Sequence, residues 1–155
     1  MTLTVNMIVI AHNIRSLYNV GSIFRNTAAF GAEKLYLTGY TGTPPRKEIA
    51  KVALGAQDLI EWEQGEVNDV ISSLKKGGYR VYGLETGGED IASFTRPEKL
   101  ALVLGSEVEG IEPAVLDQLD GTLNIPMAAK RSLNVSVASG IALYQLIKAT
   151  PRKGV

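Results

Sequence analysis

Short, continuous apolar runs recur along this sequence, and they constrain the fold more than any other feature. They cover residues 5–10, 34–39, 59–62, 79–85, 100–107 and 122–126. A strand that faces water on one side alternates apolar and polar residues, whereas a strand buried on both faces is apolar throughout. The runs therefore predict the strands of a mostly parallel sheet that is covered on both faces.

Helical patterns lie between these runs, at residues 22–30, 46–54, 66–76, 113–119 and 132–148. Gly31 and Gly55 follow the first two, at the position where a left-handed residue commonly ends a helix. Residues 39–47 and 86–94 read as irregular loops. Strands that alternate with helices predict an α/β fold with helices on both faces of the sheet. A chain of 155 residues has the size of one domain, and we expect residues 1–155 to form a single one.

Composition excludes several kinds of chemistry. The chain has no cysteine and a single histidine, His12, so disulfides, thiolate nucleophiles and multi-histidine metal centres are absent, and we expect no metal. Because 16 basic residues balance 16 acidic ones, a nucleic-acid partner would have to be met by local basic patches. The apolar run at residues 5–10 is too short for a membrane span or a signal segment, which predicts a cytoplasmic protein with no membrane partner.

Other common catalytic patterns also find no support. Carboxylates are paired at Glu61 and Glu63 and at Glu107 and Glu109, but neither context suggests a glycosidase dyad. The sequence has no GxSxG elbow, and His12 lies in no triad-like spacing. The glycines after residue 104 do not follow GxGxxG, and a P-loop lysine is missing.

Three segments carry unusual polar residues. In residues 13–31, Asn19, Gly21 and Arg25 follow a predicted strand and open a helix, whose N-terminus presents unpaired N–H groups. Asn19 either caps this helix or serves a site. Arg25 lies in a turn that is otherwise apolar, so it either pairs with a surface carboxylate or serves the same site.

The second segment, residues 100–111, is a buried strand that runs directly into Gly105, Ser106 and Glu107 and then Gly110. Glycines at these positions let the backbone approach a ligand closely. The alternative interpretation is an ordinary tight turn with a solvated Glu107.

The third segment, residues 131–146, is an apolar helix with a polar start. Ser132 is well placed as its N-cap, whereas Asn134 is placed in the first turn to reach a ligand or a neighbouring loop. The apolar residues at helical spacing form a stripe that we expect to face the core: Leu133, Val137, Ile141 and Tyr144. The small residues form a face suited to close helix packing or a subunit contact: Ser136, Ser139 and Gly140.

Taken together and in this order, the segments resemble the SpoU/TrmH family of the SPOUT superfamily, whose members are S-adenosylmethionine-dependent RNA 2′-O-ribose methyltransferases. The resemblance covers nearly the whole chain. The motifs that carry it are Asn19-x-Gly21-x-x-x-Arg25, Leu104-Gly105-Ser106-Glu107-x-x-Gly110, and Ile125-Pro126-Met127 followed by Ser132-Leu133-Asn134-Val135-Ser136-Val137-Ala138.

The resemblance implies a deep trefoil knot near the C-terminus, a homodimer with its active site near the interface, S-adenosylmethionine as the cofactor, and tRNA or rRNA as the substrate. The residues that it implies for cofactor binding are Glu85, Thr86, Gly87, Leu104, Gly105, Gly110, Ile125, Met127 and Leu133. The residues that it implies for catalysis are Arg25 and, around it, Asn19, Glu107, Ser132 and Asn134.

RNA contacts would come from local basic patches, because the net charge is zero. The candidates are Arg15, Arg46, Lys47, Lys51, Lys130 and Arg131. Two departures from the family pattern bear on function. Residues 128–131 stand where the family usually has a glycine and one more residue, so we expect a tighter or redirected cofactor loop. The separate RNA-binding domain of larger members has no counterpart in these 155 residues.

Two alternatives remain open at this point. One is a catalytically silent module that binds RNA or the cofactor with the same fold, favoured by the altered residues 128–131. The other is a methyltransferase that acts on a small molecule or a protein, favoured by the neutral net charge.

Overall fold

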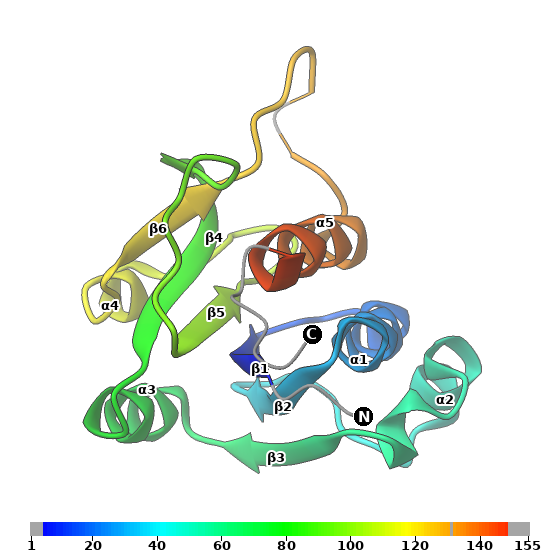
Figure 1. Cartoon of the computed structure of the whole chain (residues 1–155). Coiled ribbons are helices and arrows are strands. Elements are labelled where there is room, and N and C mark those ends of the chain that lie inside the picture. The colour runs from blue at the N-terminus through cyan, green and yellow to red at the C-terminus, as the bar shows by residue number, and fades with distance from the viewer. Residues whose placement is uncertain (1–4, 131, 149–155) are drawn as a thin grey trace.

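The computed structural model describes residues 5–130 and 132–148. Six strands form one sheet in the order β3-β2-β1-β5-β4-β6, and each neighbouring pair is parallel (Figure 1). The strands are β1 (Val5–His12), β2 (Ala32–Thr38), β3 (Glu61–Gly65), β4 (Arg80–Asp90), β5 (Leu100–Leu104) and β6 (Gly121–Asn124). The predicted parallel α/β sheet is therefore confirmed, with shifted strand ends.

Helices cover both faces of this sheet, as predicted. They are α1 (Leu17–Phe30), α2 (Lys47–Ala53), the 3-10 helix η1 (Ala56–Asp58), α3 (Val67–Lys76), α4 (Pro113–Leu116) and α5 (Val135–Lys148). Helices α1 and α5 pack side by side on one face, and α3 and α4 lie on the other (Figure 1). Within the described part of the chain, no helix has both the length and the apolar character needed to cross a membrane.

Strand β1 shows why its sequence is apolar without alternation. Its odd-numbered residues Met7 and Val9 belong to the core beneath α1 and α5. Its even-numbered residues Ile8 and Ile10 belong to the core beneath α3 and α4. Because successive side chains point to opposite faces, a central strand of a doubly covered sheet needs an apolar residue at every position.

Strand β3 departs from this pattern. The sequence predicted a buried strand at residues 59–62, but β3 begins at Glu61 and lies at the edge of the sheet. Leu59 precedes it and is 79% exposed. Lys34 of β2 forms ion pairs with the carboxylates of Glu61 and Glu63, at 3.4 and 2.7 Å. An edge strand has one unpaired side, and charged residues there discourage pairing with other chains.

Helix α1 begins at Leu17, earlier than the predicted residue 22. Ser16 is its N-cap, and the Ser16 hydroxyl accepts a hydrogen bond from the Asn19 backbone N–H at 3.2 Å. The alternative in which Asn19 caps the helix is therefore wrong. Gly31 ends the helix in the left-handed conformation, at φ 77°, as expected. Gly21 permits close packing with α2, because a Cβ there would lie 2.5 Å from the Ile49 carbonyl oxygen.

Helix α5 begins at Val135, and its cap is not the predicted Ser132. The Asn134 side-chain oxygen accepts hydrogen bonds from the Ser136 backbone N–H at 2.8 Å and from the Ser136 hydroxyl at 2.6 Å. This is the geometry of an N-cap, for which asparagine is among the preferred residues. Ser132 instead lies before the helix, in the segment that follows β6.

The apolar stripe of α5 does not face the core, which corrects a second prediction. The stripe residues are 40% to 53% exposed: Leu133, Val137, Ile141 and Tyr144. The buried face consists of Ser139, Ala142, Leu143, Leu146 and Ile147. Both faces are rich in apolar residues, so periodicity alone did not identify the one that packs inward.

The small residues of α5 pack against α1, as one of the two interpretations predicted. Ser139 is fully buried, and its hydroxyl accepts a hydrogen bond from the Asn26 side-chain amide at 3.0 Å. The same amide donates to the Ser136 carbonyl oxygen at 2.9 Å. A Cβ added at Gly140 would lie 3.4 Å from the Asn26 side chain. Small side chains on α5 thus let Asn26 join the two helices.

Candidate functional site

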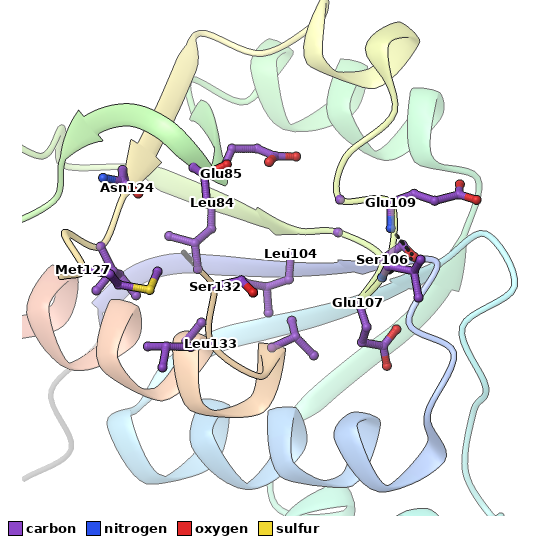
Figure 2. A pocket seen from close by; sticks show the side chains of 17 residues that line it. Leu84, Glu85, Leu104, Ser106, Glu107, Glu109, Asn124, Met127, Ser132 and Leu133 are labelled. Carbon is purple, nitrogen blue, oxygen red and sulfur yellow. Dashed lines mark hydrogen bonds between the residues drawn. The ribbon is translucent and has the colours of Figure 1, made fainter. Parts of the chain in front are cut away.

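A cavity of about 330 Å³ opens beside residues 84–86 of β4, where β5 and β6 end and the approach to α5 begins (Figure 2). Loops at the carboxyl ends of parallel strands are the usual place for a ligand in α/β folds. The side chains of Leu84, Leu104, Met127 and Leu133 lie at the centre and left of the view, and the acidic side chains lie above and to their right (Figure 2). The cavity therefore combines an apolar wall with a polar rim.

Most of the residues implied for cofactor binding line this cavity. They are Glu85, Thr86, Leu104, Gly105, Gly110, Ile125, Met127 and Leu133. Gly87 is not among the lining residues. Met127 reaches the cavity even though residues 128–131 depart from the family pattern. Of the residues implied for catalysis, Glu107 and Ser132 line the cavity.

The wall formed by Glu85 and Thr86 is a bulge in β4. Leu84 and Glu89 are both registered with Leu123 of β6, so the residues between them are left out of the ladder. A Cβ at Gly88 would lie 2.7 Å from the Thr122 backbone, which explains a glycine there. Residues 86–94 were predicted to be a loop, but β4 continues beyond the bulge to Asp90. A bulge of this kind redirects side chains without ending the strand.

The loop after β5 is folded tightly back on itself. Ser106 and Gly110 form an antiparallel bridge, with N–H to oxygen distances of 3.1 and 2.9 Å. A Cβ at Gly105 would lie 2.6 Å from the Gly110 carbonyl carbon and 2.7 Å from the Ile111 nitrogen. Gly105 is thus required by a close backbone approach inside the loop, at a point that also lines the cavity.

Glu85 fastens this loop to β4. Its carboxylate accepts a hydrogen bond from the Ile111 backbone N–H at 2.6 Å. Gly110 has φ 70°, and a Cβ there would lie 2.8 Å from the same carboxylate. Two walls of the cavity, the bulge of β4 and the loop after β5, are therefore held together by one side chain.

Glu107 fastens the other side of the loop to the start of α1. Its carboxylate accepts hydrogen bonds from the backbone N–H groups of Arg15 and Ser16 and from the Asn19 side-chain amide, at 2.9, 3.0 and 2.9 Å. Burial alone would raise the pKa of Glu107, but these hydrogen bonds outweigh it and lower the pKa. Glu107 is exposed and lies in a tight turn, as the alternative interpretation expected, but its carboxylate also holds this turn to the start of α1.

Arg25 lies outside this cavity. Its exposed side chain lines a second hollow with Ser22, Val52, Val137 and Ile141, between α1, α2 and α5. Within residues 5–130 and 132–148, no carboxylate lies within ion-pair distance of Arg25. The first turn of α5 separates the two hollows, because Val135 lines the cavity at the strand ends and Ser136 lines the hollow around Arg25. Asn134, the cap of α5, lines neither of them.

The basic residues expected to contact RNA are exposed wherever the structure describes them. These are Arg15, Arg46, Lys47, Lys51 and Lys130, whereas Arg131 lies outside the described residues. Arg15 belongs to the segment that Glu107 holds beside the cavity. Lys47 and Lys51 lie on α2, whose N-terminus follows the loop at the carboxyl end of β2.

Seven lining residues were not predicted as site residues, although Ser106, Val135 and Ala138 lie within the sequence motifs. They are Leu84, Ser106, Val108, Glu109, Asn124, Val135 and Ala138. Asn124 carried a usable signal, since it is the last residue of a strand and side chains there belong to the ligand edge of a parallel sheet. For metal binding, no group of three or more histidine, cysteine, aspartate or glutamate side chains comes together among the described residues.

Known proteins resemble this chain over most of its length. Residues 6–144 match the SpoU rRNA Methylase family. The 23S rRNA (guanosine-2′-O-)-methyltransferase RlmB of Vibrio vulnificus is 30% identical over 147 residues, which are 92% of this chain and 59% of that protein. The tRNA (guanosine(18)-2′-O)-methyltransferase TARBP1 of Mus musculus is 30% identical, over 90% of this chain and 9% of that protein. The chain spans 38% to 62% of three further relatives described as tRNA/rRNA methyltransferases.

Solved structures share the fold. The AdoMet-bound rRNA methyltransferase from Sinorhizobium meliloti superposes with a TM-score of 0.87 at 24% identity, over 95% of this chain and 57% of that one. The SpoU methyltransferase AviRb from Streptomyces viridochromogenes, in complex with AdoMet, superposes with a TM-score of 0.82 at 26% identity. This match covers 91% of this chain and 59% of that one. The family match runs from the second residue of β1 into α5 and covers most of the chain, so the chain belongs to the SpoU rRNA methylase family.

Proposed function

We propose that this chain is an RNA methyltransferase that transfers a methyl group from S-adenosylmethionine to a ribose 2′-hydroxyl of tRNA or rRNA. The observation on which the proposal depends is the cavity between the bulge of β4 and the carboxyl ends of β5 and β6, because the second and third family motifs meet there. Relatives named as rRNA and tRNA 2′-O-methyltransferases support the reaction class. Such an enzyme would work where tRNA and rRNA are found, in the cytoplasm.

The cavity fits S-adenosylmethionine in chemistry. Leu84, Leu104 and Leu133 offer an apolar wall for an adenine ring, and Glu85 adds a carboxylate. At Gly105 the missing side chain leaves backbone exposed on the cavity wall. Neighbours of the same fold are described as AdoMet-bound or in complex with AdoMet. When bound, S-adenosylmethionine supplies an electrophilic methyl group on a positively charged sulfur.

The protein must then position a ribose hydroxyl and help it lose its proton. Arg25 is the residue we assign to this step, but a guanidinium stays protonated at ordinary pH and is a poor base. Its two-pronged donor geometry suits an oxyanion or a phosphate. We therefore infer that Arg25 stabilises the developing negative charge or holds a neighbouring phosphate, and that the proton leaves through phosphate or water.

We propose a homodimer formed through the apolar stripe of α5. Val137, Ile141 and Tyr144 are each exposed by 41% or more, which is unusual for three large side chains on one helical face. Val137 and Ile141 also line the hollow that holds Arg25. A second copy seated on the stripe would therefore close over Arg25, so that the active site lies beside the subunit interface.

We also propose that the segment after β6 is threaded as a deep trefoil knot, as the family resemblance implies. Strand β6 is at one edge of the sheet, and the chain returns from there to place α5 against α1 (Figure 1). Several lining residues of the cavity belong to this returning segment, among them Ile125, Met127 and Leu133. Threading would fix their positions relative to β4 and β5.

A transfer assay tests the proposed reaction. Labelled S-adenosylmethionine is supplied with tRNA, rRNA or protein fractions, using the wild type, Arg25→Ala and Arg25→Lys. We expect label in RNA as alkali-resistant 2′-O-methyl nucleotides, little transfer by Arg25→Ala, and slow transfer by Arg25→Lys, which keeps the charge and loses the two-pronged geometry. Label in the protein fraction, or cofactor binding without transfer to any fraction, would contradict the proposal and support one of the two alternatives.

A further inference from the structure

The single histidine of the chain is buried at the end of β1 and is not used by the proposed reaction. The His12 side chain is 5% exposed. Its Nδ1 atom lies 2.9 Å from the Thr38 hydroxyl on the neighbouring strand, and its Nε2 atom lies 2.6 Å from the Glu112 carboxylate. A histidine with both ring nitrogens engaged is fixed in orientation.

The two partners define which nitrogen carries the proton. An ionised carboxylate can only accept a hydrogen bond, so Nε2 donates to Glu112. In the neutral ring Nδ1 is then the acceptor, and the fully buried Thr38 hydroxyl donates to it. His12 and Thr38 are also paired in the register of β1 and β2. The hydroxyl, the ring and the carboxylate thus form one chain of hydrogen bonds from the sheet to Glu112.

Glu112 stands at the end of the loop that walls the cavity. It directly follows Ile111, whose backbone N–H is held by Glu85. The Glu112 side chain is 50% exposed, so it could be hydrated by water without a contact to His12. Glu85 and Glu107 tie the loop to β4 and to α1, and the Glu112 bond to His12 adds a tie to β1, the central strand beside β5.

We propose that His12 is a positioning residue for the cofactor, acting through Glu112 on the loop of residues 105–111. Resting on the proposed function, this inference assigns His12 to the affinity for S-adenosylmethionine and not to the methyl-transfer step. Loss of the bond would let the end of the loop move away from β1 and widen the cavity. Cofactor affinity would fall, whereas the turnover of bound cofactor would change little.

The decisive variants are at Glu112, because its half-exposed side chain can be changed at little cost to folding. Glu112→Ala removes the acceptor, while Glu112→Gln keeps an amide oxygen that accepts from Nε2. Asp117→Ala is the matched control: Asp117 is an exposed acidic residue at the end of α4, outside the cavity lining. Binding of S-adenosylmethionine is measured by calorimetry, and KM and kcat are measured separately.

We expect Glu112→Ala to raise the cofactor Kd and KM about tenfold, as for the loss of one hydrogen bond to a charged group. Glu112→Gln should recover most of the affinity, and Asp117→Ala should match the wild type. In a further variant, His12→Asn, the shorter amide stands near the Nδ1 position and loses the donor to Glu112, so adding Glu112→Ala should weaken binding no further than either change alone, since both remove the same bond.

Other outcomes separate the two proposals. A wild-type chain that binds no S-adenosylmethionine would overturn the proposed function itself. Wild-type binding together with unchanged affinity in Glu112→Ala would overturn only the role of His12. Equal losses of cofactor affinity in Glu112→Ala and Asp117→Ala would also overturn the role of His12. So would a fall in kcat with KM unchanged in Glu112→Ala. If His12→Asn fails to fold, the three single variants at positions 112 and 117 still decide.

Discussion

The side-chain amide of Asn19 donates a hydrogen bond of 2.9 Å to the carboxylate of Glu107, which is 88 residues further along the chain. The same carboxylate accepts from backbone N–H groups of Arg15 and Ser16 at the start of α1. A negative charge at a helix N-terminus satisfies donors that have no partner within the helix and interacts favourably with its dipole. The first two family motifs are therefore one structural unit, in which Glu107 anchors the loop that walls the cavity.

Glu107 should make the free energy of unfolding depend on pH. A carboxyl group whose pKa is lowered in the folded state stabilises that state above its unfolded pKa, about 4.3, and the contribution is lost as pH falls through the lower folded value. We expect Glu107→Gln to be less stable than the wild type at about pH 7, and the difference to shrink below about pH 4. Urea unfolding across this range measures it, with Asp117→Asn as the control. A difference independent of pH would contradict the prediction.

Gly105→Ala should disable the cavity without unfolding the sheet. The added methyl group would meet backbone atoms of Gly110 and Ile111, at 2.6 and 2.7 Å, and backbone cannot move aside as a flexible side chain can. We expect loss of S-adenosylmethionine binding by calorimetry and a far-UV spectrum like that of the wild type. Gly77→Ala is the matched control, because its added atom would lie 3.4 Å from the Leu74 carbonyl oxygen and Gly77 has φ −81°. Normal cofactor affinity in Gly105→Ala would contradict the prediction.

The sequence predicted the architecture well because the apolar runs report burial directly. Strand β5 is buried at every position, and its run could only be read as a central strand. The exception, β3, is an edge strand whose apolar residues Leu59 and Ile60 lie before its first residue. The apolar residues here are therefore not the ones that pair with β2, because an edge strand has a single neighbour and carries charged residues.

The site was predicted less completely, for two physical reasons. Contacts such as Glu85 with Ile111 and Glu112 with His12 join residues far apart in sequence, and spacing does not reveal such pairs. On α5, Val137 and Ile141 looked like core residues because periodicity identifies an apolar face without saying what covers it. The exposed face agrees with a role in subunit contact.

Charge placed on the α5 stripe should therefore prevent self-association. Ile141 is 41% exposed and belongs to both the stripe and the hollow around Arg25. We expect the wild type to sediment as a dimer and Ile141→Glu to sediment as a folded monomer with little methyl transfer, since a buried unpaired carboxylate is costly. Leu59→Glu is the matched control, because Leu59 is 79% exposed and lies outside the stripe. A dimeric Ile141→Glu would rule out this interface.

Arg96 should contribute strongly to stability. Its buried guanidinium donates to the carbonyl oxygens of Pro97, Leu146, Asn6 and Glu98, at 2.9, 3.3, 3.0 and 2.7 Å. Desolvation lowers the pKa of Arg96, in keeping with its burial. We expect Arg96→Lys to lower the free energy of unfolding by about 2–4 kcal/mol, since one ammonium group cannot reach all these acceptors. Urea unfolding measures the loss. Exposed Arg80→Lys serves as control, and an equal effect of both changes would contradict the assignment.

RNA binding should depend on salt, and the basic residues of α2 should account for part of that dependence. Each phosphate contact contributes about 0.7 to 0.9 to the slope of log affinity against log salt. Lys47 and Lys51 are exposed on α2, next to the carboxyl end of β2. We expect Lys47→Gln and Lys51→Gln each to weaken binding of any RNA sequence and to lower the slope by about one contact.

Lys76→Gln is the matched control for this measurement. Lys76 is the last residue of α3 and comes just before β4, so it lies near the amino-terminal ends of the strands, away from the cavity at their carboxyl ends. It should leave both the affinity and the slope unchanged. Fluorescence anisotropy with a labelled RNA, titrated at several salt concentrations, gives both quantities. If the α2 variants and Lys76→Gln reduce the slope equally, the attraction comes from the overall charge of the protein. Phosphate contacts on α2 would then be excluded, and RNA would have to approach the cavity from another side.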